Sequence, residues 1–593
     1  MKYILKYVKK YYPMVALSLV LLIAQAFCSL MLPNLMSDIV NVGIQDYSQQ
    51  ILAQPDVAQS AALQSDQRNY ILVMGLKMLF LAVCTTAVAL GVNFTNARMG
   101  AGIAKDLRKA VFTKIEGFSS QEFDTFSTSS LITRTTNDIQ QVQQLFTMGI
   151  RMLFFAPLMA VGAIFMAVSK APSMIWINAL TVVLVLGMMA ITFALLMSKF
   201  GIMQSLVDKL NLTARESLSG MMVVRAFSKQ RYEEQRFDKV NTEYSKTNLY
   251  VNKVMSVMMP TMDLIQYLMP VLIIIVGAGR IATSELKVGD MMAFIQYSAT
   301  IMQAFAMISM IFIMFPRAKV SIGRIGEVFD MEYAIKEKSE PIKLENDSCT
   351  IEFKDVEFSY PSSEEKVLEN INFTVRPGQT TAIIGSTGCG KTSLVNLITR
   401  LYEVTSGEVK INGVNVKDLD LKQLRSYVGY VPQKSLLFSG TIDSNLRIGR
   451  ADATHEEIKT AARIAQADDF IGEKEDGYLC EISQGGTNVS GGQKQRLAIA
   501  RAIAKKAPIY VFDDSFSALD FKTDANLRRA LKENLTDATI IIVGQRVASI
   551  RDADQIIVMD EGKIVGIGKH KELLESCEQY REIASSQLST EEM

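Results

Sequence analysis

The chain has 593 residues, of which 49% are hydrophobic and 21% charged, and its formal net charge is +1. This length exceeds one ordinary domain, and a high apolar fraction beside so much charge indicates two unlike halves. The near-neutral charge, without a basic stripe that carries interleaved aromatics, argues against a nucleic-acid partner. The six cysteines contain no Cys-x-x-Cys pair and therefore indicate neither a zinc site nor a disulfide framework.

Six apolar stretches in the first half are each long enough to cross a bilayer, which takes about 20 residues. We expect a membrane all-α domain with spans at residues 14–36, 70–94, 149–169, 173–197, 256–279 and 290–315. The basic N-terminus before the first stretch resembles a signal peptide, but the apolar run is too long and no small-residue cleavage pattern follows it. The first stretch is therefore predicted to be a membrane span.

Basic residues are concentrated in the segments on one side of the predicted membrane and are scarce on the other side. The N-terminus and segments 98–134 and 199–246 are rich in Lys and Arg, whereas the loop 37–69 holds four Asp and a single base, Arg68. The positive-inside rule then places both termini in the cytosol. The two inner segments are far longer than a hairpin needs and have helical periodicity, so we expect the membrane helices to continue into the cytosol.

The second half has the mixed charge of a soluble domain and begins with alternation typical of a strand, at Ile351–Phe358. The predicted ranges are a membrane domain at 1–325, a linker at 326–347, a nucleotide-binding domain at 348–585 and a tail at 586–593. No domain precedes the first span, so a peptide exporter with a fused protease is not expected.

A complete phosphate-binding loop follows an apolar strand at Thr380–Ile384 and opens a predicted helix at Thr392–Arg400. Its glycines let backbone N–H groups converge on phosphate oxygens, a lysine adds positive charge and a threonine offers a hydroxyl to Mg²⁺. A glycine-rich turn without a ligand is the alternative. The predicted ATP-binding residues are Gly385, Ser386, Thr387, Gly388, Cys389, Gly390, Lys391, Thr392 and Ser393. We interpret Cys389 as a variable loop position rather than a redox sensor.

A second buried apolar strand, Ile509–Phe512, ends in Asp513, a carboxylate placed to hold Mg²⁺. With this residue the whole chain resembles the exporter branch of the ATP-binding cassette (ABC) transporter family. The resemblance implies an α/β phosphate-loop domain with a helical subdomain after the six spans. It also implies ATP and Mg²⁺ as cofactors, Tyr360 stacked on adenine, Gln433 beside Mg²⁺ together with Thr392 and Asp513, and a signature sequence at Ser490, Gly491, Gly492 and Gln493. Segments 123–138 and 220–227 resemble the inner loops whose short helices transmit force.

In this family two nucleotide domains close head to tail, so that each ATP lies between one chain's phosphate loop and the other's signature sequence. Members that hydrolyse well place Glu where this chain has Asp514 and His where it has Gln545. A shorter carboxylate is withdrawn by ~1.5 Å, and a misplacement of about 1 Å can cost on the order of a hundredfold in rate. Gln545 can donate a hydrogen bond but cannot take up a proton near neutral pH.

Two interpretations of these changes remain open. In the first, the chain is the hydrolytically impaired subunit of a heterodimer with a second, non-identical half-transporter. Its intact signature would then complete the partner's site, and Gln484, where many homodimeric members have Glu, agrees with this. In the second, the changes are neutral drift in a symmetric homodimeric exporter. A channel or sensor of the same fold, gated by slow ATP turnover, is a further alternative.

The membrane half of the sequence gives less information about the substrate than the second half gives about ATP. Its abundant Met suits a pliable pocket for varied apolar compounds, but packing and lipid contact explain Met equally well. Asp263 is a carboxylate within an apolar span, and such residues rarely face lipid. We expect it either to contact a cationic substrate or to lie in a wet inner cavity. The resemblance favours export of amphipathic, drug-like or lipid-like small molecules through a bacterial inner membrane.

Overall fold

The computed structural model describes residues 2–54, 56–344, 349–361, 363 and 365–588. Residues 345–347 of the expected linker and 589–593 of the expected tail lie outside that part. The chain divides into two compact units. The first comprises Met1–Glu116 and Ser129–Asp330, and the second comprises Gly117–Thr128 and Met331–Met593. The second unit therefore includes a short segment from the first inner loop as well as the C-terminal part of the chain.

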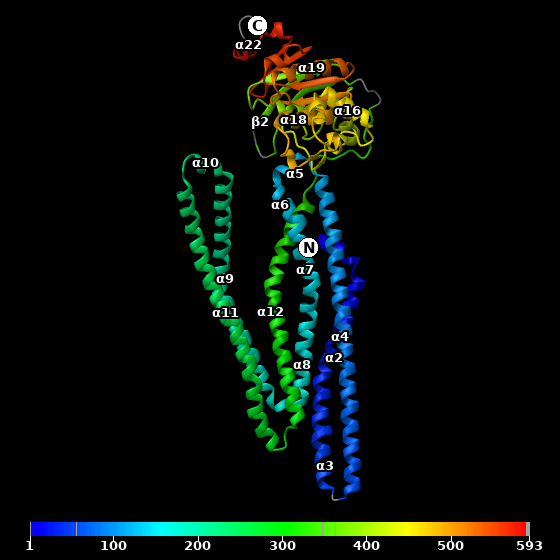
Figure 1. Ribbon diagram of the computed structural model, residues 1–593, viewed down its shortest axis with the longest axis vertical. Helices are drawn as coiled ribbons and strands as arrows, with labels where there is room; N and C mark the ends of the chain where they lie inside the picture. Colours follow the sequence, from blue (N-terminus) through cyan, green and yellow to red (C-terminus); the bar gives the residue numbers. More distant parts are fainter. Residues whose placement is uncertain (1, 55, 345–348, 362, 364, 589–593) are drawn as a thin grey trace. The chain divides into compact units, whose positions relative to one another are not determined.

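The first unit is entirely helical (Figure 1). Within the described residues, six helical stretches are long and apolar enough to cross a membrane, which confirms the predicted number of apolar helices. The elements are α1 (Lys2–Lys9), α2 (Tyr12–Asp38), η1 (Ile39–Asp46), α3 (Tyr47–Ala53), α4 (Val57–Glu116), α6 (Thr128–Thr133), η2 (Arg134–Asp138), α7 (Ile139–Gln144), η3 (Leu145–Gly149), η4 (Arg151–Phe155), α8 (Ala156–Lys170), η5 (Pro172–Met174), α9 (Ile175–Ser219), α10 (Met221–Ala226), α11 (Gln230–Ala282) and α12 (Val288–Asp330).

Several of these helices run well past the bilayer, as the long inner segments predict. Helix α4 has 60 residues, which at about 1.5 Å per residue is ~90 Å, or three times the hydrocarbon thickness. Helices α9 and α11 form a hairpin whose tip is the short helix α10 (Figure 1). Close helix packing in this unit uses small residues: four alanines of α8 (Ala156, Ala160, Ala163 and Ala167) are buried, as is common where transmembrane backbones approach one another.

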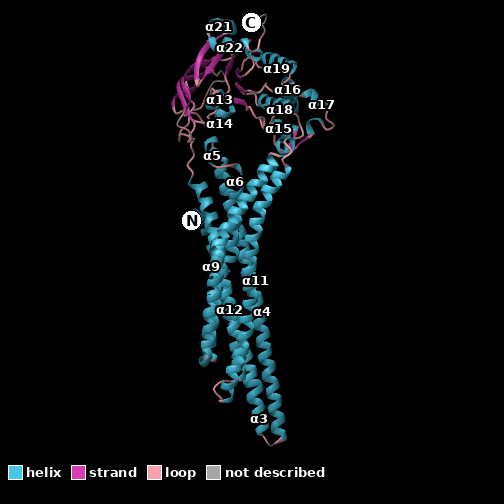
Figure 2. Cartoon of the chain, turned by 90° about the vertical axis from the view of Figure 1, so that its left-hand side faces the viewer, coloured by secondary structure: helices cyan, strands magenta, loops and turns pink. Residues whose placement is uncertain are grey.

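The second unit contains two larger sheets and a surrounding set of helices (Figure 2). An antiparallel sheet has the order β2-β1-β4-β5, with β1 (Ile351–Ser359), β2 (Lys366–Val375), β4 (Ser406–Ile411) and β5 (Val414–Asn415). The main sheet has the order β12-β11-β3-β10-β9-β6, with β3 (Thr380–Gly385), β6 (Val428–Val431), β9 (Ile509–Asp513), β10 (Thr539–Val543), β11 (Gln555–Asp560) and β12 (Lys563–Gly568). A small pair joins β7 (Gly440–Thr441) to β8 (Glu481–Ile482).

The helices of this unit cover both faces of the main sheet and build a helical subdomain, so the predicted fold class is confirmed. They are α5 (Ser120–Thr125), α13 (Lys391–Ile398), α14 (Leu421–Ser426), α15 (Ile442–Arg447), α16 (His455–Ile464), α17 (Asp468–Gly472), η6 (Gly477–Leu479), η7 (Gln484–Gly486), α18 (Gly491–Ala504), α19 (Phe521–Asn534), α20 (Val547–Ile550), α21 (His570–Ser576) and α22 (Glu578–Ser585).

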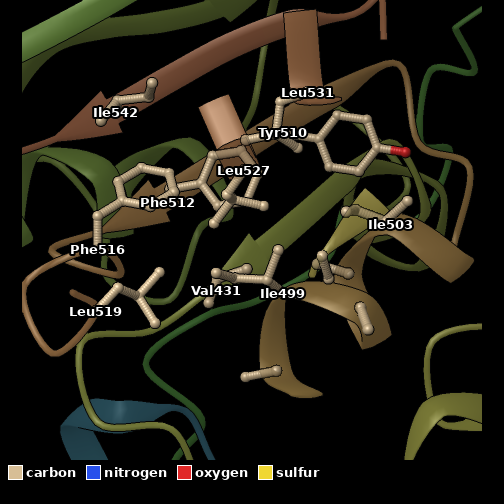
Figure 3. Packing of buried hydrophobic residues seen from close by; sticks show 14 of the residues in the cluster. Val431, Ile499, Ile503, Tyr510, Phe512, Phe516, Leu519, Leu527, Leu531 and Ile542 are labelled. Carbon is tan, nitrogen blue, oxygen red and sulfur yellow. The ribbon is translucent and has the colours of Figure 1, made fainter. Parts of the chain in front are cut away.

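Strand β9 is buried on both of its faces in the core of this unit. Tyr510 and Phe512 of β9 gather with apolar side chains of α18 and α19 (Figure 3), and Val511, on the opposite face of the strand, belongs to a second apolar cluster. Burying each large apolar side chain stabilises the fold by roughly 1.5–3 kcal/mol. Because both faces are buried, the strand is apolar throughout until its last residue, Asp513.

The short segment Gly117–Thr128 is anchored to the second unit by a buried carboxylate. Glu122 is 2% exposed and accepts hydrogen bonds from the backbone N–H of Ser119 at 2.7 Å and of Ala334 at 2.6 Å. Asp124 accepts a 3.0 Å hydrogen bond from the hydroxyl of Tyr402. The helix α5 therefore has specific polar attachments to Ala334, before the nucleotide-binding domain, and to Tyr402 within it.

Candidate ATP-binding and hydrolysis site

The register of the parallel strands brings the chemical groups to one edge of the main sheet. Strands β3, β10 and β9 are neighbours, with Val543 paired to Ile383 on one side and to Asp513 on the other. The phosphate loop, Gln545 and Asp514 all follow the carboxyl ends of these strands, which is where ligands bind in open α/β sheets. Residues separated by more than a hundred positions in sequence are thereby placed side by side.

The phosphate loop has the backbone that its glycines predict. Gly388 and Gly390 have φ values of +88° and +96°, in the left-handed region that glycine adopts at low cost. A Cβ at Gly390 would lie 2.9 Å from the carbonyl oxygen of Val367, so the loop has no room for a side chain there. Lys391 opens α13 and its Nζ donates hydrogen bonds to the carbonyl oxygens of Gly385 at 2.8 Å and Ser386 at 2.7 Å.

The thiol of Cys389 lies inside this loop. The residue is 4% exposed, and its Sγ is 3.6 Å from the Nζ of Lys391. A Cβ at Gly385 would approach the same sulfur to 2.8 Å, so the thiol fills the space beneath the loop.

The two predicted Mg²⁺ ligands from separate motifs are in direct contact. The hydroxyl of Thr392 donates to Asp513 Oδ1 at 3.1 Å, and the hydroxyl of Tyr430 approaches Asp513 Oδ2 at 3.4 Å and donates to Asn396 at 3.0 Å. Burial raises the pKa of Asp513, and its hydrogen bond from Thr392 opposes that effect. A buried carboxylate beside a hydroxyl fits Mg²⁺, which prefers oxygen ligands and retains several waters. Thr392 and Asp513 would hold the ion and Lys391 would face the phosphates.

The second carboxylate of the pair is bound by two side-chain amides. Asp514 has a left-handed backbone with φ +47°, and its Oδ2 accepts hydrogen bonds from Gln433 Nε2 at 3.2 Å and Gln545 Nε2 at 2.9 Å. Gln587, which the sequence analysis did not single out, accepts from the N–H of Val547 and donates to the carbonyl oxygen of Gln545, both at 2.8 Å. The structure therefore brings Asp514, Gln433 and Gln545 together, whereas the sequence placed Gln433 beside Mg²⁺ with Thr392 and Asp513.

The signature residues form a complete capping box at the start of α18. Ser490 Oγ accepts from the N–H of Gln493 at 3.3 Å, and Gln493 Oε1 accepts from the N–H of Ser490 at 3.1 Å. Gly491 and Gly492 follow in the first turn. Further along α18, Gln495 donates to the carbonyl oxygen of Asp514 at 3.4 Å and accepts from the N–H of Ala518 at 3.3 Å. This helix therefore contacts the backbone that carries Asp514, a link that the motifs alone did not reveal.

Tyr360, the predicted adenine-stacking residue, lies in an aromatic cluster beside α13. Its ring is edge-to-face with Phe358 at 4.9 Å and with Tyr402 at 5.3 Å. Its hydroxyl is 2.8 Å from Ser393 Oγ, where either oxygen is able to donate. Tyr360 and Ser393, predicted separately, therefore meet at the phosphate-loop helix. Asp263 belongs to the first unit, where it is exposed on α11.

These elements define a class: a phosphate-loop ATPase domain that follows a six-helix membrane domain in one chain. Residues 15–305 match the ABC transporter transmembrane region and residues 368–517 match the ABC transporter family. The chain is 39% identical over 587 residues to "Uncharacterized ABC transporter ATP-binding protein MT1311" of Mycobacterium tuberculosis, covering 98% of this chain and 97% of that protein. It is 34% identical over 587 residues to the uncharacterized ABC transporter ATP-binding protein YfiB of Bacillus subtilis, covering 99% and 98%.

The chain belongs to the ABC transporter family. Its fold is similar to that of a solved bacterial Atm1-family ABC exporter with ATP bound, with a TM-score of 0.75, 22% identity and coverage of 98% of this chain and 99% of that one. The membrane domain and the ATP-binding domain are fused, so the chain is a half-transporter with the exporter fold, and its activity is ATP-coupled transport.

Proposed function

We propose that this chain is one subunit of a heterodimeric exporter that moves drug-like or lipid-like amphipathic compounds out of the cytosol. Both termini lie in the cytosol, and the membrane is a bacterial inner membrane. The chain's own phosphate loop binds ATP with Mg²⁺ but hydrolyses it poorly. Its signature sequence completes the active site of a second, non-identical half-transporter.

The hydrogen bonding of Asp514 is the observation that carries this proposal. A general base must reach its water within hydrogen-bond distance, and each carboxylate oxygen has two lone-pair directions. Both directions at Oδ2 are used by the amides of Gln433 and Gln545. The side chain is also one methylene shorter than Glu. Oδ1 alone then remains to take a proton from a water at the γ-phosphate, and it is carried on the shorter side chain, so we expect Asp514 to be a poor general base.

The proposed division of labour follows from what remains intact. The loop glycines, Lys391, Thr392 and Asp513 keep their expected geometry, which supports nucleotide binding. Mg²⁺ would neutralise phosphate charge there. The capping box uses the N–H groups of Ser490 and Gln493, and the N–H groups of Gly491 and Gly492 in the first helical turn remain for a γ-phosphate from another chain. An asymmetric pair requires one chain whose own site binds ATP but hydrolyses it poorly and whose signature sequence is intact.

Co-purification with the product of a neighbouring half-transporter gene, followed by ATPase assay, tests the proposal. We expect little turnover from this chain alone and brisk turnover from the pair. Brisk turnover by the chain alone, with one band on a gel, would support the symmetric homodimer instead. Ion current without vectorial movement of a solute, measured in planar bilayers, would support the channel.

We further propose that Asp263 interacts with cationic substrates. It is exposed on α11 in the membrane unit, where a carboxylate needs a proton or a counter-charge. The substitution Asp263→Asn should reduce transport of a cationic compound more than transport of a neutral one. Equal losses, or no change in either, would contradict the charge-recognition idea.

A further inference from the structure

Three helical elements of the membrane unit bring together a group of polar side chains near one end of the spans. Ser18 of α2 is fully buried and donates a 2.7 Å hydrogen bond to Asn96 Oδ1 of α4. Asn93 lies one turn away on α4, and its Oδ1 accepts a 3.3 Å hydrogen bond from Arg151 Nη1 of η4. Because residues three apart share a helix face, Asn93 and Asn96 present their amides side by side.

Two donors in this group have no partner. Arg151 Nε and Asn96 Nδ2 are buried atoms without a hydrogen bond among the described residues, and Asn96 is only 2% exposed. Leaving such donors unpaired costs more than the typical hydrogen bond contributes. One further atom, Gln25 Oε1, is a buried acceptor without a partner on α2. A ligand that offers acceptor oxygens would satisfy both donors.

The charge of the group identifies the ligand class. Arg151 carries a guanidinium cation, and within the described part of the chain no acidic side chain forms an ion pair with it. Its guanidinium carbon lies 5.5 Å from the ring centroid of Phe155, so one side of the cation is apolar. A charged residue within a membrane segment normally pairs or marks a substrate pathway. An unpaired arginine beside an aromatic ring suits an anionic head group with an apolar tail.

We propose that Arg151, with Asn93 and Asn96, binds the carboxylate or phosphate of an amphipathic anionic substrate. That the bound anion is a transported substrate rests on the proposed function, whereas the anion site itself rests on the contacts of Arg151, Asn93 and Asn96. Asn93 is next to the end of the second predicted span and Arg151 next to the start of the third. With the orientation proposed above, the anion lies at the cytosolic membrane boundary while the tail extends into the apolar region. Arg151 is half-buried, so a ligand has access to it.

The test measures binding to the purified transporter that contains this chain, whatever its subunit composition, in phosphatidylcholine nanodiscs without ATP. The probes are dodecyl phosphate, dodecyltrimethylammonium and octaethylene glycol monododecyl ether, which share a tail and differ in charge. We expect saturable binding of dodecyl phosphate, weakened about tenfold or more by Arg151→Gln, with the other two probes unaffected. Lys77→Gln, which removes a different cation from α4, is the matched control and should leave all three unchanged.

A second variant keeps the proposal testable if Arg151→Gln does not fold. Asn93→Asp keeps the side-chain size and places a carboxylate against Arg151, so the arginine is neutralised from within. It should weaken dodecyl phosphate binding as Arg151→Gln does. Unchanged dodecyl phosphate binding in both variants, or equal losses for all three probes, would overturn the anion site.

Transport of the bound anion separates a substrate from a structural lipid. If the site holds a substrate, ATP should drive loss of dodecyl phosphate from the cytosolic side of proteoliposomes, and Arg151→Gln should slow that loss. Charge-selective binding without ATP-driven movement would show that the site holds a lipid head group and would overturn the substrate assignment. Because binding is measured without nucleotide, its outcome is independent of whether the chain hydrolyses ATP or forms a heterodimer.

Discussion

Two adjacent carboxylates at the end of β9 have opposite surroundings. Asp513 is 1% exposed and touches a hydroxyl that is itself a candidate metal ligand, whereas Asp514 turns its side chain toward two amides through a left-handed backbone. Asp513 is the last residue of β9, and the left-handed backbone of Asp514 redirects the chain directly after the strand. The first residue is therefore suited to metal binding, whereas one oxygen of the second is already held by amide donors.

If the productive site belongs to the partner, substitutions at the signature sequence and at Asp514 of this chain should have very different effects on ATPase activity. Ser490→Arg removes a hydroxyl donor, and Gly491→Asp adds a carboxylate that repels the partner's γ-phosphate. For either substitution we expect a loss on the order of a hundredfold or more in ATPase activity. Asp514→Asn lies at the other site and should cost only severalfold, with ATP still bound. Both are measured in the assembled complex. If Asp514→Asn is as damaging as the signature substitution, this chain's own site is catalytic.

The double substitution Asp514→Glu with Gln545→His should act in the opposite direction. It restores a longer carboxylate and a side chain that takes up a proton near neutral pH, so nucleotide bound at this loop should be hydrolysed faster. Single-turnover hydrolysis of radiolabelled ATP reports this, in a complex whose partner site is inactivated. Gln545→Asn, which shortens the amide, is the control. No increase over the parent complex would show that the two residues do not limit this site.

At the scale of elements, the segment Gly117–Thr128 connects the membrane helices to the nucleotide domain. The rings of Tyr402 and Tyr360 meet at 5.3 Å, and the Tyr402 hydroxyl reaches Asp124. Burial and the neighbouring Asp124 raise the pKa of Tyr402 to about 12, so its hydroxyl remains a donor at neutral pH. A residue next to the predicted adenine site thus also contacts α5.

We expect Tyr402→Phe to weaken coupling while leaving ATP binding intact. The ring packing is kept and only the hydrogen bond to Asp124 is lost. Substrate stimulation of ATPase activity should fall severalfold, with the nucleotide Kd and basal turnover nearly unchanged. Asp124→Asn, which still accepts a hydrogen bond, should have a smaller effect. A matching loss of nucleotide affinity in Tyr402→Phe would show that Tyr402 acts at the nucleotide rather than on α5.

The attachment of α5 should also depend on pH through Glu122. Burial raises the pKa of this carboxyl, but hydrogen bonds from Ser119 and the Ala334 N–H prevail, so its pKa lies below the model-compound value of 4.5. The ionised form therefore stabilises the fold above pH 4.5, and that contribution is lost as pH falls through the lowered pKa. Glu122→Gln should be less stable at neutral pH, and its thermal midpoint should fall less than the parent's on acidification. Parallel curves would contradict this.

The sequence predicted what local pattern and motif spacing encode. Long apolar runs gave the six spans, and the phosphate loop with Asp513 gave the ATP site, because each has a physical requirement that only a few residues meet. Attachments between distant segments were not predictable: Tyr402 and Asp124 are separated by 278 positions, and Gln587 reaches Gln545 from the turn that follows α22. Such contacts depend on tertiary packing that leaves no periodic signal in the chain.

At the scale of the whole molecule, the proposed asymmetry concerns how long each nucleotide stays bound. A site that binds ATP without hydrolysing it stabilises the closed pair through occupancy, since a ligand stabilises the state to which it binds. The partner's site would turn over repeatedly in the same interval. Two sites with different roles should therefore exchange nucleotide at different rates within one complex.

Lys391→Ala tests this distinction in the assembled complex. It removes the ammonium group of Lys391, whose Nζ lies within 2.8 Å of the carbonyl oxygens of Gly385 and Ser386. Because this positive charge would face the phosphates, ATP affinity at this site should fall. Turnover should fall only in part, because the productive site takes its lysine from the partner. The matched Lys-to-Ala change in the partner's phosphate loop should abolish turnover. Exchange of trapped, labelled nucleotide should be biphasic in the parent complex, with the slow phase lost in Lys391→Ala. A single exchange rate for both sites would mean that the two sites are equivalent and that the asymmetric mechanism is wrong.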